Sequence, residues 1–290
     1  MLKAILRNLR TGVVTTRYPA EPAEPPARFR GAPQVRASSS ADALPSASCC
    51  PSGAITDAKG ESPYAIDLGR CMFCGRCAEP TPKPGESAIE IGRRFELAAH
   101  NRQHLILEVG HDADGQASPR AADLPAQEIP AVIRRTLGRS LQLRHLDSGS
   151  CNACDWELSA LLNPVYDVRR LGIDFVASPR HADGVIVTGP VTRNLETAVR
   201  RTYEAVPDPR IVIAVGACAV SGGIVGRSYA SAGGVAEVLP VDVHIPGCPP
   251  RPEAVIFGIL LAVGRLAARG ESLRVAVRAG SGPSAASPLA

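Results

Sequence analysis

The chain has 290 residues, 45% of them hydrophobic, which is enough for one large core or two modest domains. Its formal net charge of +4 is mild, and the basic residues form no stripe of the kind that nucleic-acid binding requires. The sequence contains no run of about 18 or more apolar residues, so we expect no membrane span.

The nine cysteines are the most informative part of the composition. The basic residues at the N-terminus are not followed by the apolar stretch and cleavage site of a secretory signal, so we expect a cytoplasmic protein. In a reducing compartment, cysteines are more often metal ligands than disulfide partners.

The first 36 residues predict a short amphipathic helix over residues 1–18, followed at 19–36 by an extended strap rich in Pro, Ala and Glu. The apolar face of this helix suits docking onto a partner, onto a membrane surface or onto its own domain.

Residues 37–92 contain Cys71, Cys74 and Cys77 in the Cys-x-x-Cys-x-x-Cys spacing of bacterial ferredoxins. Cys50, followed by a proline, matches the last cysteine of a preceding half of that pattern. A two-cluster ferredoxin would also have cysteines at four positions that here are Ser40, Ala43, Ser46 and Thr81. Because the fourth cysteine of each half binds the other half's cluster, the four absent ligands belong to one cluster and the four retained ligands to the other. We therefore predict a small α+β ferredoxin-like domain with one 4Fe–4S cluster.

A zinc site is the alternative for these four cysteines. Zinc sites usually pair two Cys-x-x-Cys knuckles, whereas here three cysteines run at consecutive spacing and the fourth is remote. Cys49 is surplus, and we interpret it as a packing or exposed thiol. Arg70 and Arg76 either raise the potential of the cluster or only solvate its loop.

Residues 93–139 are interpreted as a linker and a lead-in helix. A short apolar run at 105–109 suits one strand paired to a neighbour, and the apolar residues of 127–139 recur at helical spacing.

Residues 140–269 alternate strand and helix patterns. Strands are expected at 141–146, 173–177, 185–188, 211–215 and 241–245, and helices at 155–162, 194–205 and 253–268. Most of the strands are β-branched runs without polar alternation, as in parallel strands that are buried on both faces. We predict an α/β fold with a doubly wound, flavodoxin-like, mostly parallel sheet, followed by a disordered tail at 270–290.

Four cysteines follow the ends of three of these strands: Cys151 and Cys154 follow the first, Cys218 the fourth and Cys248 the fifth. Because the carboxyl ends of parallel strands meet at one edge of the sheet, these thiols are expected to be neighbours. Glycines at 149, 216 and 247 allow the backbone to approach an inorganic core closely. We predict a second 4Fe–4S cluster. The alternatives are ordinary buried cysteines, or a redox pair at 151 and 154 that leaves the other two unused.

Glu157 and His181 are the remaining candidates. Glu157, one turn into the helix after Cys154, is either a proton relay at a partner interface or an acid favourable to the helix dipole. His181 either hydrogen-bonds near the cluster or is a solvated loop histidine. No dinucleotide fingerprint or Walker sequence occurs, so binding of NAD or ATP is unsupported.

The segments around the second cysteine set resemble a known family. They are 147–157 (Asp-Ser-Gly-Ser-Cys-Asn-Ala-Cys-Asp-Trp-Glu), 178–183, 188–193, 216–223 and 240–250. They are similar to the small subunit of membrane-bound, energy-converting (group 4) nickel–iron hydrogenases, including those of formate hydrogenlyase, and to the 20 kDa subunit of respiratory complex I. The resemblance implies that Cys151, Cys154, Cys218 and Cys248 bind the 4Fe–4S cluster nearest the active site of a separate large subunit.

Two details refine this resemblance. Complex I members carry adjacent cysteines at the first site, whereas Cys151 and Cys154 have the hydrogenase-like spacing. The N-terminal part, to about Leu107, looks like the ferredoxin-type subunit of the same complexes, so that two subunits look fused and one cluster is lost.

The resemblance implies an oxidoreductase subunit that is catalytic only within its complex. It would relay electrons through two 4Fe–4S clusters to or from the nickel–iron site of a partner large subunit. Other iron–sulfur and membrane subunits would hold the chain on the cytoplasmic face of the inner membrane. The alternatives are a complex I-like module that passes electrons to quinone, and a non-catalytic scaffold that holds zinc.

Overall fold

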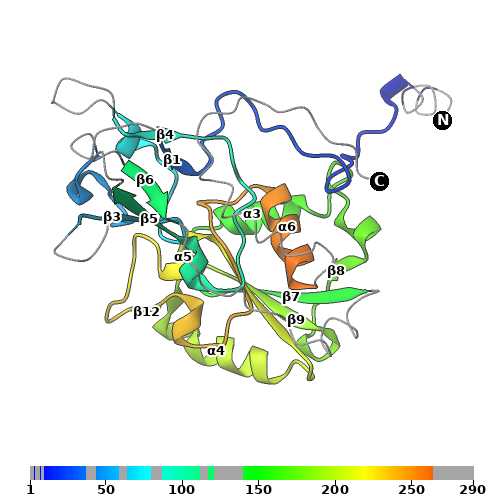
Figure 1. The fold of residues 1–290 in the computed structure, drawn as a ribbon. Coiled ribbons are helices and arrows are strands. Elements are labelled where there is room, and N and C mark those ends of the chain that lie inside the picture. The colour runs from blue at the N-terminus through cyan, green and yellow to red at the C-terminus, as the bar shows by residue number, and fades with distance from the viewer. Residues whose placement is uncertain are drawn as a thin grey trace.

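The computed structural model describes residues 10–36, 44–58, 64–79, 87–111, 117–120 and 140–263, together with Lys3 and Arg7. Figure 1 shows a region of short antiparallel strands beside a larger α/β unit. The predicted helix over 127–139, the predicted tail at 270–290 and part of the predicted N-terminal helix lie outside the described residues.

The α/β unit is built on a parallel sheet of five strands. They are β7 (Leu141–Asp147), β8 (Ile173–Phe175), β9 (Gly184–Thr188), β11 (Ile211–Val215) and β13 (Val243–Ile245). Their order across the sheet is β13-β11-β9-β7-β8, which is the flavodoxin-like order of a doubly wound fold. The predicted fold class of this unit is therefore confirmed, and all five predicted strands are present.

Four helices cover the two faces of this sheet: α3 (Ala153–Ala160), α4 (Arg193–Glu204), α5 (Gly216–Ser221) and α6 (Pro252–Ala262). Ile211, Ile213 and Val215 of β11 belong to the core that contains α3 and α6, whereas Val212 and Ala214 belong to the core that contains α4 and α5. Successive strand residues point to opposite faces, so β11 is buried on both sides. Every described residue of α6 is buried. The helices expected from the pattern are thus present, and the short α5 is additional.

A two-stranded pair, β10 (Val191–Thr192) with β12 (Ser231–Gly233), and the 3-10 turns η5 (Val168–Leu171), η6 (Pro179–His181) and η7 (Val235–Glu237) complete the α/β unit.

The N-terminal region is an antiparallel β structure. One sheet has the order β2 (Ile55–Thr56), β3 (Tyr64–Asp67), β5 (Ile106–His111) and β6 (Ala117–Arg120), and a separate pair joins β1 (Pro33–Val35) to β4 (Ile89–Ile91). The 3-10 turns η2 (Ala47–Cys49), η3 (Arg76–Ala78) and η4 (Arg102–Leu105) connect these strands. Between residues 33 and 120, no described residue is α-helical, and a ferredoxin-like domain stays a prediction. Two strands come from the segment interpreted as a linker, so the sheet continues past the expected boundary at residue 92.

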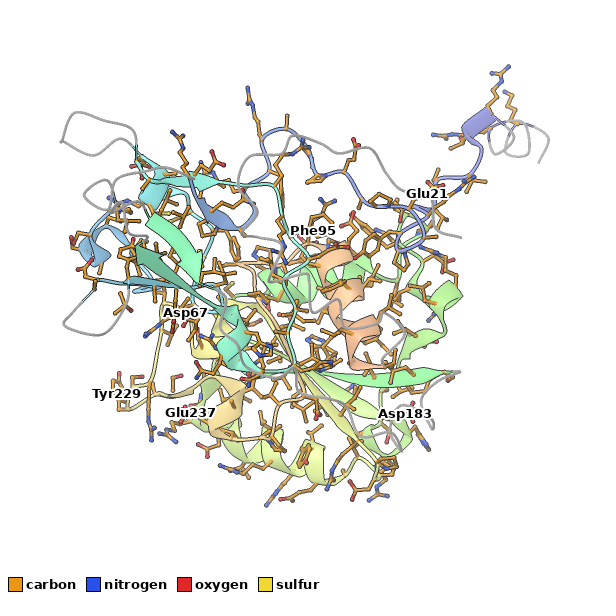
Figure 2. The ribbon with its side chains drawn as sticks, viewed as in Figure 1. Glu21, Asp67, Phe95, Asp183, Tyr229 and Glu237 are labelled. Carbon is orange, nitrogen blue, oxygen red and sulfur yellow. The ribbon has the colours of Figure 1, made fainter. Side chains whose placement is uncertain are left out.

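The two regions pack directly against each other. The backbone of Ala99 pairs with that of His244 on β13, through N–H···O distances of 3.0 and 2.8 Å. Buried Leu68 and Leu105 share one apolar core with Val220 of α5. The predicted helix over 1–18 is wrong for residues 12–18, which are not helical, because the helix ends at Thr11 and is followed by Gly12 in left-handed backbone (φ +66°). Residues 19–32 are extended chain with isolated turns. Figure 2 shows Phe95 between the N-terminal strands and α6. In the described part of the chain, no helix has the length and apolarity that a membrane crossing needs.

Candidate functional site

Four cysteines gather at the carboxyl edge of the parallel sheet. Cys151 lies in the loop after β7, Cys154 is buried in the first turn of α3, Cys218 lies in α5 after β11, and Cys248 follows β13. Burial raises the pKa of the Cys154 thiol, and the nearby thiols of the other three raise it further. Thiols act on the pKa of Cys154 in this way only from close by, so the sheet brings together the four residues expected from their strand ends.

Glycines make room for these sulfur atoms. Gly216 has φ +90°, and a Cβ atom there would lie 2.5 Å from Sγ of Cys154. Gly223 has φ +54°, and a Cβ atom there would lie 2.8 Å from Sγ of Cys218. Gly149 lies against Thr192 and not against a sulfur atom: a Cβ atom there would lie 2.4 Å from the side chain of Thr192. The backbone therefore approaches the thiols at positions where no side chain fits.

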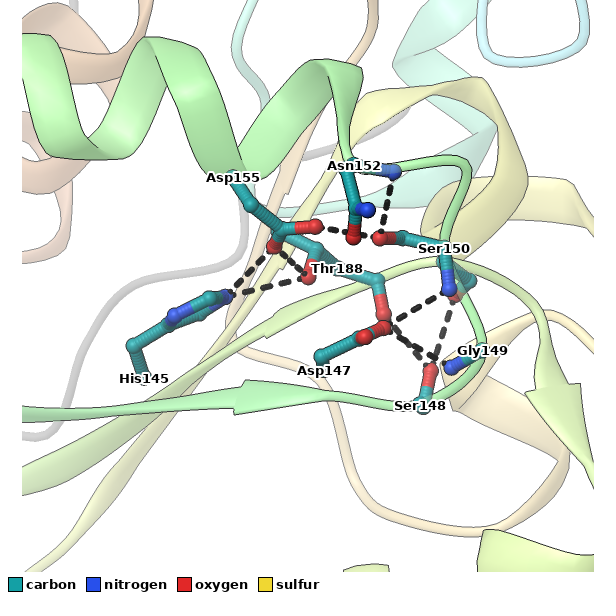
Figure 3. A network of polar contacts seen from close by, with 9 residues as sticks. His145, Asp147, Ser148, Gly149, Ser150, Asn152, Asp155 and Thr188 are labelled. Carbon is teal, nitrogen blue, oxygen red and sulfur yellow. Dashed lines mark hydrogen bonds and ion pairs between the residues drawn. The ribbon is translucent and has the colours of Figure 1, made fainter.

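A polar network supports the loop that carries Cys151 and Cys154 (Figure 3). Asp155 accepts hydrogen bonds from Nε2 of His145 (2.8 Å), from Oγ1 of Thr188 (2.6 Å) and from the hydroxyl of Ser150. Asp147 Oδ1 accepts the backbone N–H groups of Gly149 (2.9 Å) and Ser150 (2.7 Å). Burial lowers the pKa of His145, and the charge of Asp155 opposes that shift. The network ties the loop and the first turn of α3 to β7 and β9.

Sequence reasoning missed this network. Its one signal is a histidine near the carboxyl end of a strand that is expected to be buried, since a buried polar side chain needs a partner. That signal becomes specific only when β9 is placed next to β7, which sets Thr188 beside His145.

The two further candidates lie in different places. Glu157, on α3, is half-buried, and its pKa is raised by burial and by the nearby charge of Glu253. His181 is exposed in η6, two residues before Asp183, whose backbone N–H donates to the carbonyl of Gln142 at the amino end of β7. His181 therefore lies near the edge of the sheet opposite the cysteines.

The second cysteine set lines a small cavity in the N-terminal region. Its walls include Cys50, Cys71, Cys74 and Cys77, the four cysteines that the ferredoxin spacing indicates. Cys49 does not line this cavity. The loop reaches its tight shape through left-handed backbone at Phe73 (φ +56°) and at a glycine, position 75 (φ +85°).

Backbone amides surround these sulfur atoms. Cys71 Sγ accepts the N–H of Phe73 at 3.3 Å, and Cys50 Sγ accepts the N–H of Ala54 at 3.2 Å. Burial raises the pKa of Cys71 to about 12 and, together with neighbouring thiols, that of Cys77 to about 11. Burial would also raise the pKa of Cys50, but hydrogen bonds from Ser52 and Ala54 outweigh it and lower that pKa.

Both sets suit an iron–sulfur cluster in their donor chemistry: each is four free thiols with backbone close to sulfur. Among the described residues, no three His, Cys, Asp or Glu side chains are grouped so that they hold a single metal ion. Around one zinc ion, sulfurs at its usual bond length stand about 3.8 Å apart. A cubane binds each thiolate through a different iron and so accommodates thiols that are set further apart.

A second cavity, of about 220 Å³, lies between the two sets, and we call it the bridging cavity. Cys248 lines it from the α/β unit, and Met72 and Phe73 line it from the N-terminal cysteine loop. Phe73 also lines the cavity of the N-terminal set. Phe73 therefore lines both cavities, one beside each cysteine set.

The comparisons with known proteins concern the α/β unit. Residues 151–262 match the family described as NADH ubiquinone oxidoreductase, 20 Kd subunit. A probable membrane-bound hydrogenase subunit of Pyrococcus furiosus is 48% identical over 137 residues, which cover 47% of this chain and 82% of that protein. The chain belongs to this 20 kDa subunit family.

Two further relatives match over a smaller share of their own length. Formate hydrogenlyase subunit 7 of Escherichia coli is 42% identical over 155 residues, covering 53% of this chain and 61% of that protein. An NADH-quinone oxidoreductase subunit of Bacteroides thetaiotaomicron is 46% identical over 124 residues, covering 42% of this chain and 62% of that protein. The expected family is confirmed, and the chain is an oxidoreductase subunit. The N-terminal cysteines lie outside the residues that match the family.

Proposed function

We propose that this chain relays electrons through two 4Fe–4S clusters to or from the nickel–iron site of a partner large subunit in a membrane-associated hydrogenase complex. Cys50, Cys71, Cys74 and Cys77 would hold one cluster, and Cys151, Cys154, Cys218 and Cys248 the other. Such clusters supply one-electron transfer at potentials that their surroundings set. The observation that carries the proposal is the gathering of two separate four-thiol sets on either side of one cavity.

The position of the α/β set favours exchange with another protein. Cys151 and Cys248 are exposed. The segments that follow Cys154 and Cys218 carry exposed apolar side chains: Trp156 (76% exposed), Leu162, Ile224, Val225 and Tyr229 (98% exposed, Figure 2). Exposed apolar side chains that border a functional edge are typical of a surface that a partner covers. We infer that the large subunit docks here, and that Glu157 is available as a proton relay at this interface.

The spacing of Cys151 and Cys154 favours a hydrogenase-like partner, because the complex I branch carries adjacent cysteines at this site. The relatives named for hydrogenase and formate hydrogenlyase support the same choice. The second candidate is a complex I-like module that passes electrons to quinone, which the NADH-quinone oxidoreductase relatives favour. A large-subunit partner with two Cys-x-x-Cys pairs would decide for nickel–iron chemistry. Both candidates place the chain peripherally on the cytoplasmic face of the inner membrane, through its complex.

The test is the iron content of the chain purified without oxygen, with electron paramagnetic resonance of the reduced protein. We expect about eight irons per chain and two distinct cluster signals. Cys71→Ser and Cys218→Ser should each remove about half of the iron and a different signal. Cys49→Ser, next to Cys50 but outside its cavity, is the matched control and should keep both signals.

Three results would contradict the proposal. A colourless protein with stoichiometric zinc would support the scaffold alternative. Full iron after Cys71→Ser would show that this thiol is not a ligand. Loss of both signals from a still-folded Cys71→Ser protein would show that the two thiol sets are not independent sites.

A further inference from the structure

We propose that the bridging cavity binds a carboxylate, and that Arg94 and Arg251 are the side chains that hold it. This site goes beyond the electron relay proposed above and does not need iron in order to be tested.

The walls of the cavity combine aromatic, apolar and cationic side chains. Three phenylalanines (Phe29, Phe73, Phe95), Met72, Leu97 and the prolines around Cys248 provide apolar surface, and Arg30, Arg94 and Arg251 provide charge. All of the lining residues lie in the described part of the chain, and none of them is Asp or Glu. The cavity is therefore a positively charged space with an apolar wall, which suits an organic anion.

Arg251 is held rigidly with one end free. Its Nε and Nη2 donate to the buried carboxylate of Glu253 at 2.8 and 2.6 Å. Its guanidinium lies over the rings of Phe95 (4.6 Å) and Phe29 (5.3 Å). The third nitrogen, Nη1, is buried and has no hydrogen-bond acceptor in the described structure. The side chain is thus fixed in place before any ligand arrives.

Arg94 is also short of a partner. Its Nη2 is buried and has no acceptor in the described structure. The charge of Glu96 acts on Arg94, but Oε1 of Glu96 already accepts the hydroxyl of Tyr18 at 2.6 Å. Burial lowers the pKa of Arg94, and the charge of Glu96 only partly opposes this. A buried guanidinium N–H without an acceptor is unfavourable, so both arginines favour a ligand that brings one strong acceptor.

A carboxylate fits this site in charge and in shape. Guanidinium groups bind carboxylates through paired N–H···O bonds, and the two arginines offer two donors for its two oxygens. Glu253 offsets the charge of Arg251, and Arg30 and Arg94 keep the wall positively charged, so an anion is attracted. The apolar part of the wall favours an organic carboxylate over phosphate. The volume of about 220 Å³ exceeds that of a few waters and leaves room for an apolar tail.

The carboxylate comes either from a small molecule or from the side chain or C-terminus of a partner subunit. In both cases it would place negative charge beside Cys248 and Phe73, between the two thiol sets. The experiment has one arm for each source.

The first arm is calorimetric titration of the chain, purified without oxygen, with acetate, propionate, benzoate and phosphate. For a small-molecule source, we expect saturable binding of at least one carboxylate and binding of phosphate at least about tenfold weaker. Arg94→Gln should weaken carboxylate binding about tenfold or more, and Arg94→Lys by less, because it keeps the charge. Arg93→Gln is the matched control: Arg93 is adjacent and exposed, does not line the cavity, and should bind like the wild type.

The second arm uses the complete complex carrying Arg94→Lys, treated with a carbodiimide that joins amines to carboxylates. For a partner source, we expect an amide cross-link between position 94 and an Asp, Glu or C-terminus of another subunit, identified by mass spectrometry. Arg93→Lys in the same complex should give no such link.

Absence of both carboxylate binding and the cross-link would overturn the proposal, since the cavity would then hold only solvent. Equal affinities of the wild type and the Arg94→Gln protein would overturn it as well. If Arg94→Gln does not fold, Arg94→Lys replaces it in the titration, with Arg93→Lys as its matched control. Iron content measured on the same samples reports on the electron relay, so full iron without carboxylate binding contradicts only the carboxylate site.

Discussion

The two cysteine sets are assembled in opposite ways. In the N-terminal region, three of the four thiols lie within the seven residues from Cys71 to Cys77, and a tight left-handed loop brings them together. In the α/β unit, the thiols come from three strand ends that are separated by nearly a hundred residues of chain. The first set is specified mainly by local backbone, and the second by the order of strands in a sheet.

This difference indicates which substitutions should disrupt each set. The α/β set depends on the sheet that joins β7 to β11 through β9 and β11 to β13, so any change that separates these strand ends should remove it. The N-terminal set depends on a short loop and one additional thiol at Cys50. Three substitutions challenge this contrast, and they are ordered by the size of the expected effect.

Gly216→Ala and Gly75→Ala form a matched pair, because both glycines have nearly the same left-handed φ, +90° and +85°. A Cβ atom at 216 would lie 2.5 Å from the sulfur of Cys154, whereas one at 75 would meet only Ile91, at 3.6 Å, and the end of Arg30, at 3.9 Å. We expect Gly75→Ala to lower the free energy of unfolding by about 1–2 kcal/mol, the cost of the left-handed conformation alone. Gly216→Ala should cost about 3 kcal/mol or more and remove the α/β iron signal. Denaturant unfolding would measure the change in stability, and electron paramagnetic resonance would show whether the α/β iron signal is lost. Equal effects of the two substitutions would contradict the prediction.

His244 tests the contact between the two regions. Burial lowers its pKa to about 4, and the charges of Arg102 and His100 act in the same direction. The folded protein therefore binds fewer protons at this ring than the unfolded chain does, and stability falls as the pH drops from about 6.5 to about 4, by up to about 3 kcal/mol. His244→Gln should flatten this part of the profile, measured as the free energy of unfolding against pH. An unchanged slope between pH 6.5 and 4 in the His244→Gln protein would contradict this prediction.

Asp155→Asn tests the polar network beside the α/β set. It weakens the acceptor shared by His145 and Thr188, and we expect a loss of about 1–3 kcal/mol in the free energy of unfolding. The matched control is Asp174→Asn, whose partner Arg169 is 63% exposed and whose ion pair contributes about 0–1 kcal/mol. Urea denaturation distinguishes the two, and iron retention would show whether the loss is confined to the α/β set. An effect no larger than that of the control would mean that the network does not hold the loop.

Much of the α/β unit was predictable from sequence, because its strands are buried runs that carry their own signal. The valines and isoleucines of 185–188 and 211–215 indicate parallel strands. Cys218 and Cys248 closely follow the predicted ends of the strands at 211–215 and 241–245. The edge that gathers the cysteines then follows from general topology.

Other features were not predictable because they depend on tertiary contacts. Helix α5 has only six residues, too few to show a helical period. Strand β5 falls on the apolar run at 105–109 that suits one strand, and it pairs with β3. Strand β6 lies in a segment whose glycines and polar residues resemble a linker, and it is stabilised by pairing with β5. The unpaired nitrogens of Arg94 and Arg251 become evident only when the two regions are packed together.

The pairing of Ala99 with His244 has a consequence for the behaviour of the whole molecule. Strand β13 is the last strand on its side of the sheet, and an uncovered edge of this kind exposes free amides and carbonyls that can pair with another chain. The two hydrogen bonds between Ala99 and His244 occupy the middle of that short edge. The N-terminal region therefore also protects this edge from pairing with another chain. A chain that lacks residues 1–139 should be prone to self-association even if its sheet folds.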